Sequence, residues 1–578
     1  MSLPTQTGIP IAPSLPHLPA KKNTGNTRSS KRRLLQISLL SIAVAIIISL
    51  IARFLVLLIH LVTNICFYGS FDFSFRSPAD NQLGLFVIIL PAIGGLLVGL
   101  MALFGSKAIR GHGIPEAMEQ VLTNQSRIKP AIAILKPVSS AIAIGSGGPF
   151  GAEGPIIATG GALGSTIGQL FKITPNERKV ILAAGATAGM SAIFGTPIAA
   201  VFLAIELLLF EFSPKAILPV ALACITGAAG HQLLFEAGPV FPMPDLESPT
   251  NLALGIYSAT GIAIGFISLG LTKIVYWIED TFEKLPIHWM WWPAIGGLAV
   301  GLIGYFAPHT LGVGYDNITS VLSGNAPLTL MLSLCFFKFL SWAIALGSGT
   351  SGGTLAPLLT IGGAAGAIFG TLILILFPDS GINIPMAALI GMSSMFAGAS
   401  RAYLTSITFA LEATMQSHAL LPLLGACTAA YLVSFFFMEN TIMTEKISRR
   451  GVYTPDAYEP DVLRSITVAQ VLGKGRKVPG EGPAIDELLQ KNLPVVKGSD
   501  PLSKAVELMA STGEEFLPVS LSANLKEPTG ILTYKDVLHA YKLYHQENQE
   551  AGVNLSLRRQ RIKIMVKSRK LMDKTRSV

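Results

Sequence analysis

Glu153 is the one charged side chain in residues 141–168, a glycine-rich stretch that reads AIAIGSGGPFGAEGPIIATGGALGSTIG. A carboxylate in apolar surroundings is costly unless it has a partner or a function. Pro155 suits the first position of a helix, and the glycines before it let backbone N–H groups approach a ligand closely. Because N–H groups at the start of a helix attract negative charge, the stretch predicts an anion site with a carboxylate beside it.

The elements that position Glu153 are expected to be apolar helices. Of the 578 residues 51% are hydrophobic and 13% are charged, against about 25% charged in a soluble domain. Residues 34–52 form an uncharged run of membrane-spanning length, and further apolar runs follow up to residue 438. Several of these runs contain Gly or Pro or are too short to cross alone, which predicts broken and tilted helices around a protein-enclosed path. We therefore expect an all-α polytopic membrane protein.

The net charge of +9 does not indicate a nucleic-acid partner, because the Lys and Arg residues lie at the termini and in loops. A bias of positive loops toward the cytoplasm is the simpler interpretation. We expect a multi-pass protein in contact with membrane lipid, with both termini in the cytoplasm.

Composition divides the chain into parts. Residues 1–33 are polar and rich in Pro and Ser, and are expected to be a disordered cytoplasmic segment without a cleavable signal. A membrane domain at 34–450 is followed by a linker at 451–465 and a small soluble module at 466–548. Residues 549–578 are a basic tail that fits either a solvated segment or a helix on the membrane surface.

The membrane domain contains an internal repeat, roughly 84–212 and 286–418. The sequence PAIGGL at 91–96 reappears at 293–298, a shift of 202 residues. The same shift relates Lys136 to Lys338, and it relates the glycines after Pro155 to those after Pro357. A slightly larger shift, 206, relates Glu206 to Glu412.

The two copies are expected to be inverted, because loops of the first copy carry Lys and Arg where their counterparts in the second copy carry none. Inverted repeats with broken helices place a substrate site near the middle of the membrane, where helix N-termini converge on an anion. The glycine turns at 151–155 and 352–357 are the candidates.

The soluble module is expected to be a small α/β unit. Residues 493–496 (LPVV), 516–519 (FLPV) and 530–533 (GILT) are typical of strands, and 502–509 of a helix. A second helix is expected from Asp536, which gives the order β-α-β-β-α.

Three motifs, GHGIP at 111–115, GAEGP at 151–155 and GTLAP at 353–357, resemble those of the CLC family of chloride channels and proton-coupled chloride antiporters. The resemblance covers roughly 34–450. It implies an inverted-repeat fold of mostly tilted helices and a homodimer with one independent anion pathway in each subunit. It also implies that Glu153 is the gate, a carboxylate that competes with the anion and swings away when protonated. The alternative is a structural glutamate that caps a helix.

The resemblance also implies an anion-binding set in which two usual hydroxyl ligands are replaced. His112 stands at the position of the family's serine and Met443 at that of its tyrosine. A neutral imidazole donates one hydrogen bond and methionine none, so the inner mouth is expected to be wider or weakly selective. His112 is also expected to make conduction depend on cytoplasmic pH. The alternative is that His112 caps the following helix with its ring turned aside. The full set is His112, Gly113, Ile114, Gly154, Met443 and the backbone N–H groups of Thr354 and Leu355.

Proton coupling in many family antiporters needs a second acid that faces the cytoplasm. That position falls on Leu207, preceded by Glu206, and Lys136 matches a basic position that the family keeps near the pathway. The aliphatic Leu207 resembles family channels, so we expect a gated anion channel. A proton-coupled antiporter of chloride, nitrate or fluoride is the alternative.

Other classes of function fit less well. The glycine turns lack the Gly-Lys-Ser/Thr of a phosphate loop, and Glu153 has neither nucleophile nor metal partner in the sequence, so an enzyme is not expected. A cation transporter would place carboxylates opposite carbonyl groups instead of helix N-termini. The four cysteines have no metal-binding spacing, and no metal is expected.

The soluble module resembles a CBS domain, a fold that binds adenine nucleotides when paired. Thr533 and Asp536 match its ribose-contacting pattern. An adenine nucleotide is therefore the one possible cofactor, and a purely structural dimer contact is the alternative.

Overall fold

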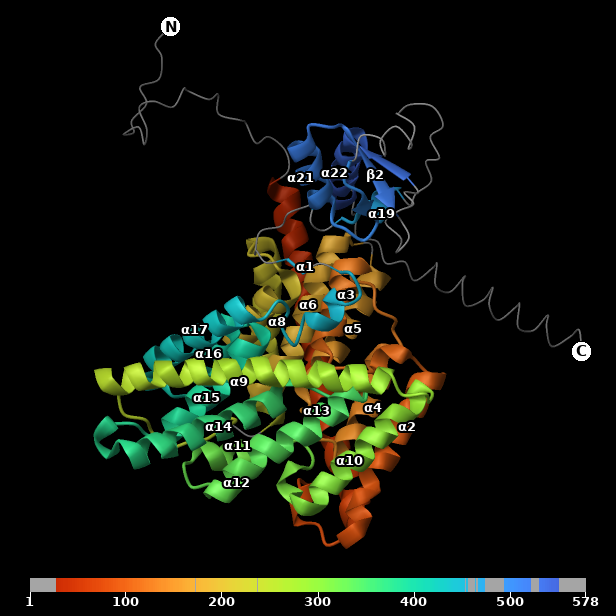
Figure 1. Cartoon of the computed structure of the whole chain (residues 1–578). Coiled ribbons are helices and arrows are strands. Elements are labelled where there is room, and N and C mark those ends of the chain that lie inside the picture. The colour runs from red at the N-terminus through yellow and green to blue at the C-terminus, as the bar shows by residue number, and fades with distance from the viewer. Residues whose placement is uncertain are drawn as a thin grey trace, which may run out of the picture.

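The computed structural model describes residues 27–171, 173–235, 238–452, 454–455, 463, 466–472, 493–520 and 530–549. A large helical body is joined to a small α/β module that lies beyond the end of the body where α1 begins (Figure 1). The predicted basic tail at 549–578, most of the linker and residues 1–26 lie outside the described part, except for Gln549 at the end of the last helix.

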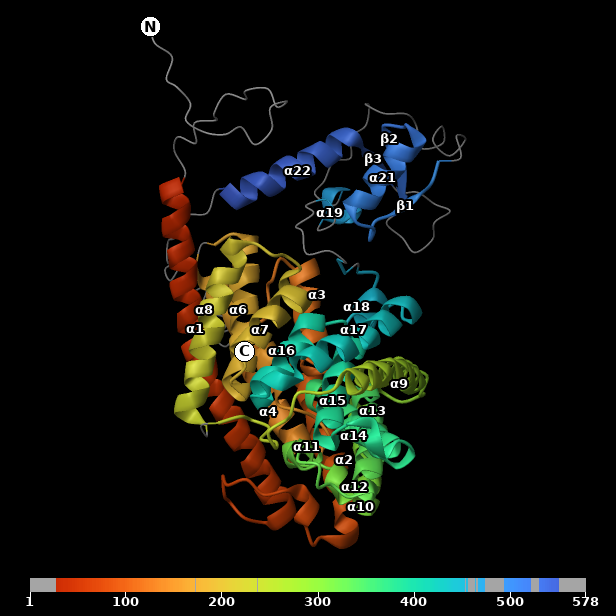
Figure 2. The same cartoon turned by 90° about the vertical axis from the view of Figure 1, so that its left-hand side faces the viewer.

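The first half of the body contains α1 (Thr27–Thr63), α2 (Leu90–Phe104), α3 (Ile114–Thr123), α4 (Ile132–Gly145), α5 (Glu153–Leu170), α6 (Pro175–Phe194), α7 (Pro197–Leu203) and α8 (Pro214–Leu234). The second half contains α9 (Asn251–Glu283), α10 (Trp292–Phe306), α11 (Tyr315–Leu322), α12 (Leu328–Leu332), α13 (Phe339–Gly347), α14 (Leu355–Leu376), α15 (Ile384–Ser400), α16 (Tyr403–Thr414), α17 (Leu420–Phe437) and α18 (Glu445–Ser448). In the view of Figure 2, α1 and α8 run side by side along one edge of the body.

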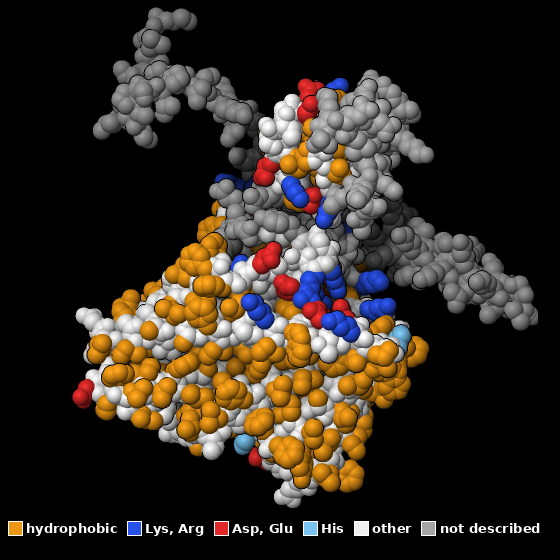
Figure 3. All heavy atoms as spheres, in the orientation of Figure 1, with side chains coloured by type: hydrophobic (Ala, Val, Ile, Leu, Met, Phe, Trp, Pro, Cys, Tyr) orange, Lys and Arg blue, Asp and Glu red, His pale blue; other side chains and the backbone are white. Residues whose placement is uncertain are grey.

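The body is built for a membrane. Within the described ranges, eight helical stretches are long and apolar enough to cross one. Hydrophobic side chains cover the visible face of the body, and charged side chains gather near its boundary with the module (Figure 3). The prediction of an all-α polytopic membrane protein is confirmed.

The contact between α2 and α10 shows that the two repeats are related by a two-fold axis. A Cβ atom on Gly95 would lie 2.1 Å from Pro293 O, and one on Gly297 would lie 2.2 Å from Pro91 O. Gly95 and Gly297 are counterparts in the repeat, and so are Pro91 and Pro293. The same contact therefore occurs twice with the two copies exchanged, as two-fold symmetry requires.

The direction of the same two helices shows that the repeats are inverted. Gly95 faces Pro293, whereas Gly99, one turn later in α2, faces Met290, which precedes Pro293 in the chain. The two equivalent helices therefore run antiparallel, and the predicted inversion is confirmed.

The start of α1 corrects one predicted boundary. We expected residues 1–33 to be disordered, but α1 begins at Thr27. The guanidinium of Arg33 donates to the carboxylate of Glu177 in α6, with 2.6 Å between Nη2 and Oε2. This ion pair holds the polar first turns of α1 against the body, so the helix extends beyond its apolar run.

From its first strand onward the module has the predicted order β-α-β-β-α, and a short helix that was not predicted, α19 (Val468–Leu472), precedes it. The module also contains β1 (Val496–Lys497), α21 (Leu502–Thr512), β2 (Phe516–Ser520), β3 (Gly530–Thr533) and α22 (Tyr534–Gln549). The sheet order is β1-β2-β3, with β1 parallel and β3 antiparallel to β2. Val496, Leu517 and Leu532 of the three strands are fully buried in one small core. The last helix begins at Tyr534, two residues before the predicted Asp536.

Candidate anion site

Three glycine turns from distant parts of the sequence meet inside the body. The N–H of Gly111, before α3, donates to Thr350 O, before α14, at 3.2 Å. The N–H of Gly353 donates to Gly151 O, before α5, also at 3.2 Å. These bonds bring together the starts of three helices, so their free N–H groups lie near one another.

Gly154, the second residue of α5, is in close contact with both of the other turns. A Cβ atom there would lie 2.2 Å from His112 O and 2.7 Å from Gly353 Cα, so only glycine fits. Gly113 is equally close, since a Cβ atom on it would lie 2.1 Å from Gly154 O. The structure therefore brings together the predicted site residues His112, Gly113 and Gly154.

The carboxylate of Glu153 occupies the junction of α5 and α14. Glu153 is 0% exposed, and its Oε1 accepts the backbone N–H of Ala356 in the first turn of α14. Its Oε2 accepts the phenol O–H of Tyr315 at 3.2 Å. Ala356 follows Thr354 and Leu355, whose N–H groups are predicted to face the anion, in the same helix start. That prediction for Thr354 and Leu355 stays a prediction.

Tyr315 is the functional candidate that the sequence analysis missed. It is the first residue of α11, and its ring packs against both Phe194 and Phe241, with centroids 5.9 Å away in each case. A signal was available, because GVGYDN at 312–317 is the counterpart of GHGIPE at 111–116 with a shift of 201. That alignment places Tyr315 opposite Ile114, a predicted site residue.

His112 and Met443, the two residues predicted to stand in place of hydroxyl ligands, are both buried. His112 is 3% exposed, and its Nδ1 has no hydrogen-bond partner within the described ranges. Met443 is 0% exposed, in a segment where Ile442 N donates to Ala399 O at 3.0 Å.

The alternative in which His112 caps α3 is wrong. Gly113 is the N-cap residue of α3, and its N–H donates to Glu116 Oε2 at 2.6 Å. The helix start thus has its carboxylate cap from Glu116, in the usual position three residues into the helix.

Lys136 is buried and bonds to backbone carbonyls. Its Nζ donates to Ile109 O and Gly111 O, both at 2.9 Å. Its counterpart Lys338 does the same in the second copy, with Thr310 O at 3.0 Å and Gly312 O at 2.8 Å. Because both copies use the lysine to hold the loop before a helix, part of its role is architectural.

Glu206, a proton-path candidate, caps a helix of the other repeat. Its Oε1 accepts Leu404 N–H at 2.8 Å, and its Oε2 accepts the N–H and O–H of Thr405 at 3.0 and 2.6 Å, at the start of α16. Its counterpart Glu412 accepts two N–H groups at the start of α7. Leu207, the other candidate, is buried among apolar residues.

Thr533 and Asp536 of the module bond to each other. Asp536 Oδ2 accepts the N–H of Thr533 at 3.0 Å and its O–H at 2.7 Å, and Asp536 N–H donates to Thr533 Oγ1 at 3.2 Å. The pair forms the reciprocal cap of α22. Nucleotide binding by these residues stays a prediction.

The chain has two inverted helical repeats, and broken helices of both repeats begin around one buried carboxylate. This arrangement is typical of polytopic membrane transport proteins. A family model described as "Voltage gated chloride channel" matches residues 93–435, more than half of the chain, and a CBS domain model matches residues 485–543. The chain belongs to this CLC family and carries a C-terminal CBS domain, as the sequence analysis predicted.

Curated relatives agree with this assignment. Chloride channel protein CLC-e of Arabidopsis thaliana is 29% identical over 399 residues, which are 64% of this chain and 55% of that protein. The H(+)/Cl(-) exchange transporter ClcA of Yersinia pestis is 30% identical over 356 residues, 59% of this chain and 72% of that protein. The chain spans about half the length of CLC-e and of CLC-f from the same plant.

Solved structures share the fold. A slow cyanobacterial Cl-/H+ antiporter matches with a TM-score of 0.63 at 22% identity, over 71% of this chain and 98% of the other. A eukaryotic CLC transporter matches with a TM-score of 0.63 at 17% identity, over 87% of this chain and 98% of the other.

Proposed function

We propose that this chain forms a gated channel for chloride or another small anion, and that Glu153 is its gate. One observation carries the proposal. The unexposed carboxylate of Glu153 accepts hydrogen bonds from the start of α14 and from Tyr315. These donors fit an anion, and a side-chain carboxylate that fills their position excludes a solute anion from it.

The hydrogen bonds of Glu153 also fit the alternative of a structural cap for α14. The two interpretations differ in whether the carboxylate leaves. A gate releases the N–H of Ala356 to a solute anion, whereas a structural cap stays bound in every state. The position of Glu153 at a meeting of three glycine turns favours the gate, since a cap alone needs only one helix start.

Proton-coupled antiport of chloride, nitrate or fluoride is the second candidate. ClcA is named as an H(+)/Cl(-) exchange transporter, and this chain is 30% identical to it. Against antiport, the position of the second acid holds the buried Leu207, and the carboxylate of Glu206 is already engaged by three donors. Both observations favour the channel.

Concurrent measurement of anion and proton flux tests the proposal. Purified protein in vesicles is given a chloride gradient, and chloride efflux and internal pH are recorded together. A channel moves chloride with no accompanying proton movement. Stoichiometric uphill proton movement would instead establish the antiporter, and the absence of anion flux would refute both candidates.

The assembly belongs to the same proposal. We place both termini in the cytoplasm, in accord with the basic loops of the first repeat, and we propose a homodimer with one pathway in each subunit. For the CBS domain we propose an adenine nucleotide as ligand, on the match of Thr533 and Asp536 to the ribose-contacting pattern.

A further inference from the structure

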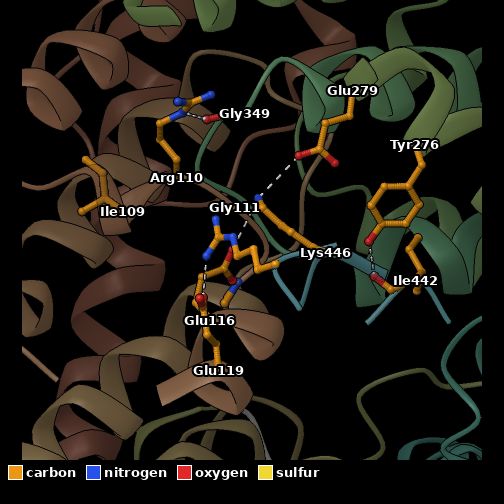
Figure 4. Close-up of polar contacts among 12 residues, drawn as sticks. Ile109, Arg110, Gly111, Glu116, Glu119, Tyr276, Glu279, Gly349, Ile442 and Lys446 are labelled. Atoms are coloured by element: carbon orange, nitrogen blue, oxygen red, sulfur yellow. Dashed lines mark hydrogen bonds and ion pairs between the residues drawn. The ribbon is translucent and has the colours of Figure 1, made fainter. Parts of the chain in front are cut away.

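Lys446 of α18 lies between two carboxylates from different parts of the body. Its Nζ is 3.8 Å from Glu116 Oε1 in α3 and 3.7 Å from Glu279 Oε1 in α9. The three side chains are each about one-fifth exposed, so solvent screens them less than surface charges. Figure 4 shows the ammonium of Lys446 directed toward Glu279, with Glu116 below it.

The carboxylate of Glu116 links this cluster to the candidate anion site. Its Oε2 accepts the N–H of Gly113, the residue that follows His112. Gly113 has a φ of +99°, a conformation that favours glycine and that the carboxylate holds in place. The other oxygen, Oε1, has no hydrogen-bond partner in the part of the chain that the structure describes, so its charge is balanced by Lys446.

Glu116 is in its charged form. Burial raises the pKa of its carboxyl group, but the nearby ammonium of Lys446 and the N–H of Gly113 are among the groups that outweigh burial and hold the pKa below its usual value. The helix α3 has ten residues and is not one of the eight spanning stretches.

The backbone of Lys446 lies three residues after Met443, in the same short segment of the chain. Ile442, the residue before Met443, accepts a hydrogen bond from Tyr276 OH of α9 at 2.8 Å. Tyr276 and Glu279 lie three residues apart on α9 and so on one face of that helix. The helix thus holds this segment at two points, through Ile442 and through Lys446 (Figure 4).

We propose that Glu116 and Lys446 are positioning residues that fix the two walls of the inner mouth, the turn at His112 and Gly113 and the segment of Met443, relative to each other. This inference rests on the proposed function. Met443 supplies no hydrogen-bond donor, and His112 Nδ1 has no partner within the described ranges. Because the N–H of Gly113 is bound to Glu116, the imidazole of His112 and the backbone N–H groups beside it are the remaining donors, and their placement decides how tightly an anion is bound.

Relative anion permeability in vesicles tests the inference, with the variants Lys446→Met, Glu116→Gln and the double variant. Each single substitution is expected to change the ratio of nitrate to chloride flux by roughly threefold or more, the range that coupling within one ion-pair network gives. The double variant should change the ratio no more than either single variant. Lys446→Arg keeps the charge and should restore the wild-type ratio.

Arg450→Gln is the matched control. Arg450 Nη1 pairs with Glu119 Oε2 at 2.6 Å, so it also joins the chain after α18 to α3. Its charge interacts with Glu116 and Glu279 too, but its ion pair is with Glu119, which leaves the pair of Glu116 and Lys446 intact. This variant should change the ratio clearly less than Lys446→Met, and an equal change in it would mean that any α3 contact matters, against the proposal.

Two other outcomes would overturn the inference. One is an unchanged flux ratio in Lys446→Met. The other is an additive effect in the double variant, because independent effects mean that the pair does not act together. If Glu116→Gln does not fold, the comparison of Lys446→Met with Lys446→Arg decides. A wild-type protein that moves no anion would refute the proposed function itself, whereas wild-type flux with unresponsive Lys446 variants would refute only the positioning.

Discussion

Replacement of Glu153 by Gln tests the gate directly, because it removes the charge and keeps the size of the side chain. In the wild-type protein the carboxylate accepts an N–H from Ala356 and an O–H from Tyr315. A hydrogen bond to a charged group contributes about 1.5–3 kcal/mol, against about 1 kcal/mol for a neutral pair. For two bonds, the loss of charge weakens the closed state by about 1 kcal/mol at the lower end of this range and about 4 kcal/mol at the upper end, and we take about 2 kcal/mol.

That loss sets the expected size of the effect. Since 1.4 kcal/mol corresponds to a factor of ten, about 2 kcal/mol lowers the closed population roughly 30-fold relative to the open one. Anion flux through Glu153→Gln near neutral pH should therefore rise, by up to about 30-fold if the wild-type gate is mostly closed. Wild-type flux should rise as the pH falls, because a protonated carboxyl group also lacks the charge.

The assay is chloride efflux from vesicles between about pH 8 and pH 5, the range over which a buried carboxyl group can titrate. Glu153→Gln is expected to give a high flux that does not change with pH. Glu247→Gln, in an exposed loop, is the control for loss of one acidic residue and should keep the wild-type profile. If Glu153→Gln keeps the pH dependence of the wild-type protein, or lowers thermal stability without raising flux, Glu153 is a structural cap and the reasoning fails.

Two further predictions concern the partners of this site. Tyr315→Phe removes one of the two bonds to the carboxylate, so flux near neutral pH should rise less than in Glu153→Gln and its pH dependence should remain; a flux equal to wild type would show that Tyr315 does not hold the gate. Glu206→Gln and Glu412→Gln each weaken a helix cap and should each destabilise the protein by about 1 kcal/mol, measured by thermal unfolding in detergent. A drop in flux with Glu206→Gln alone, at unchanged stability, would instead support the proton-path role of Glu206.

The sequence alone predicted the features that depend on residues close together in the chain or on a repeated motif. Glycine and proline mark the turns before α3, α5 and α14, the repeated PAIGGL identified the two copies, and the Lys and Arg residues of the loops indicated their inversion. The contact of Tyr315 with Glu153 was not predicted, because 162 residues separate the two and a tyrosine at a helix start resembles many others. The pairing of Lys446 with Glu116 was not predictable either, since many charges lie near the same boundary and only the fold selects partners among them.

The inverted repeat separates architecture from function at single residues. Where both copies use the same contact, as do Lys136 and Lys338 on loop carbonyls, the residue serves a need that both halves share. Function should lie where the copies differ. The shift of 202 places Leu355 opposite Glu153, and the shift of 201 places Tyr315 opposite Ile114. The carboxylate and the phenol that bind each other thus come from different copies, and each has an aliphatic counterpart. This asymmetry is what a site with a gate requires, because two equivalent carboxylates would block the path from both sides.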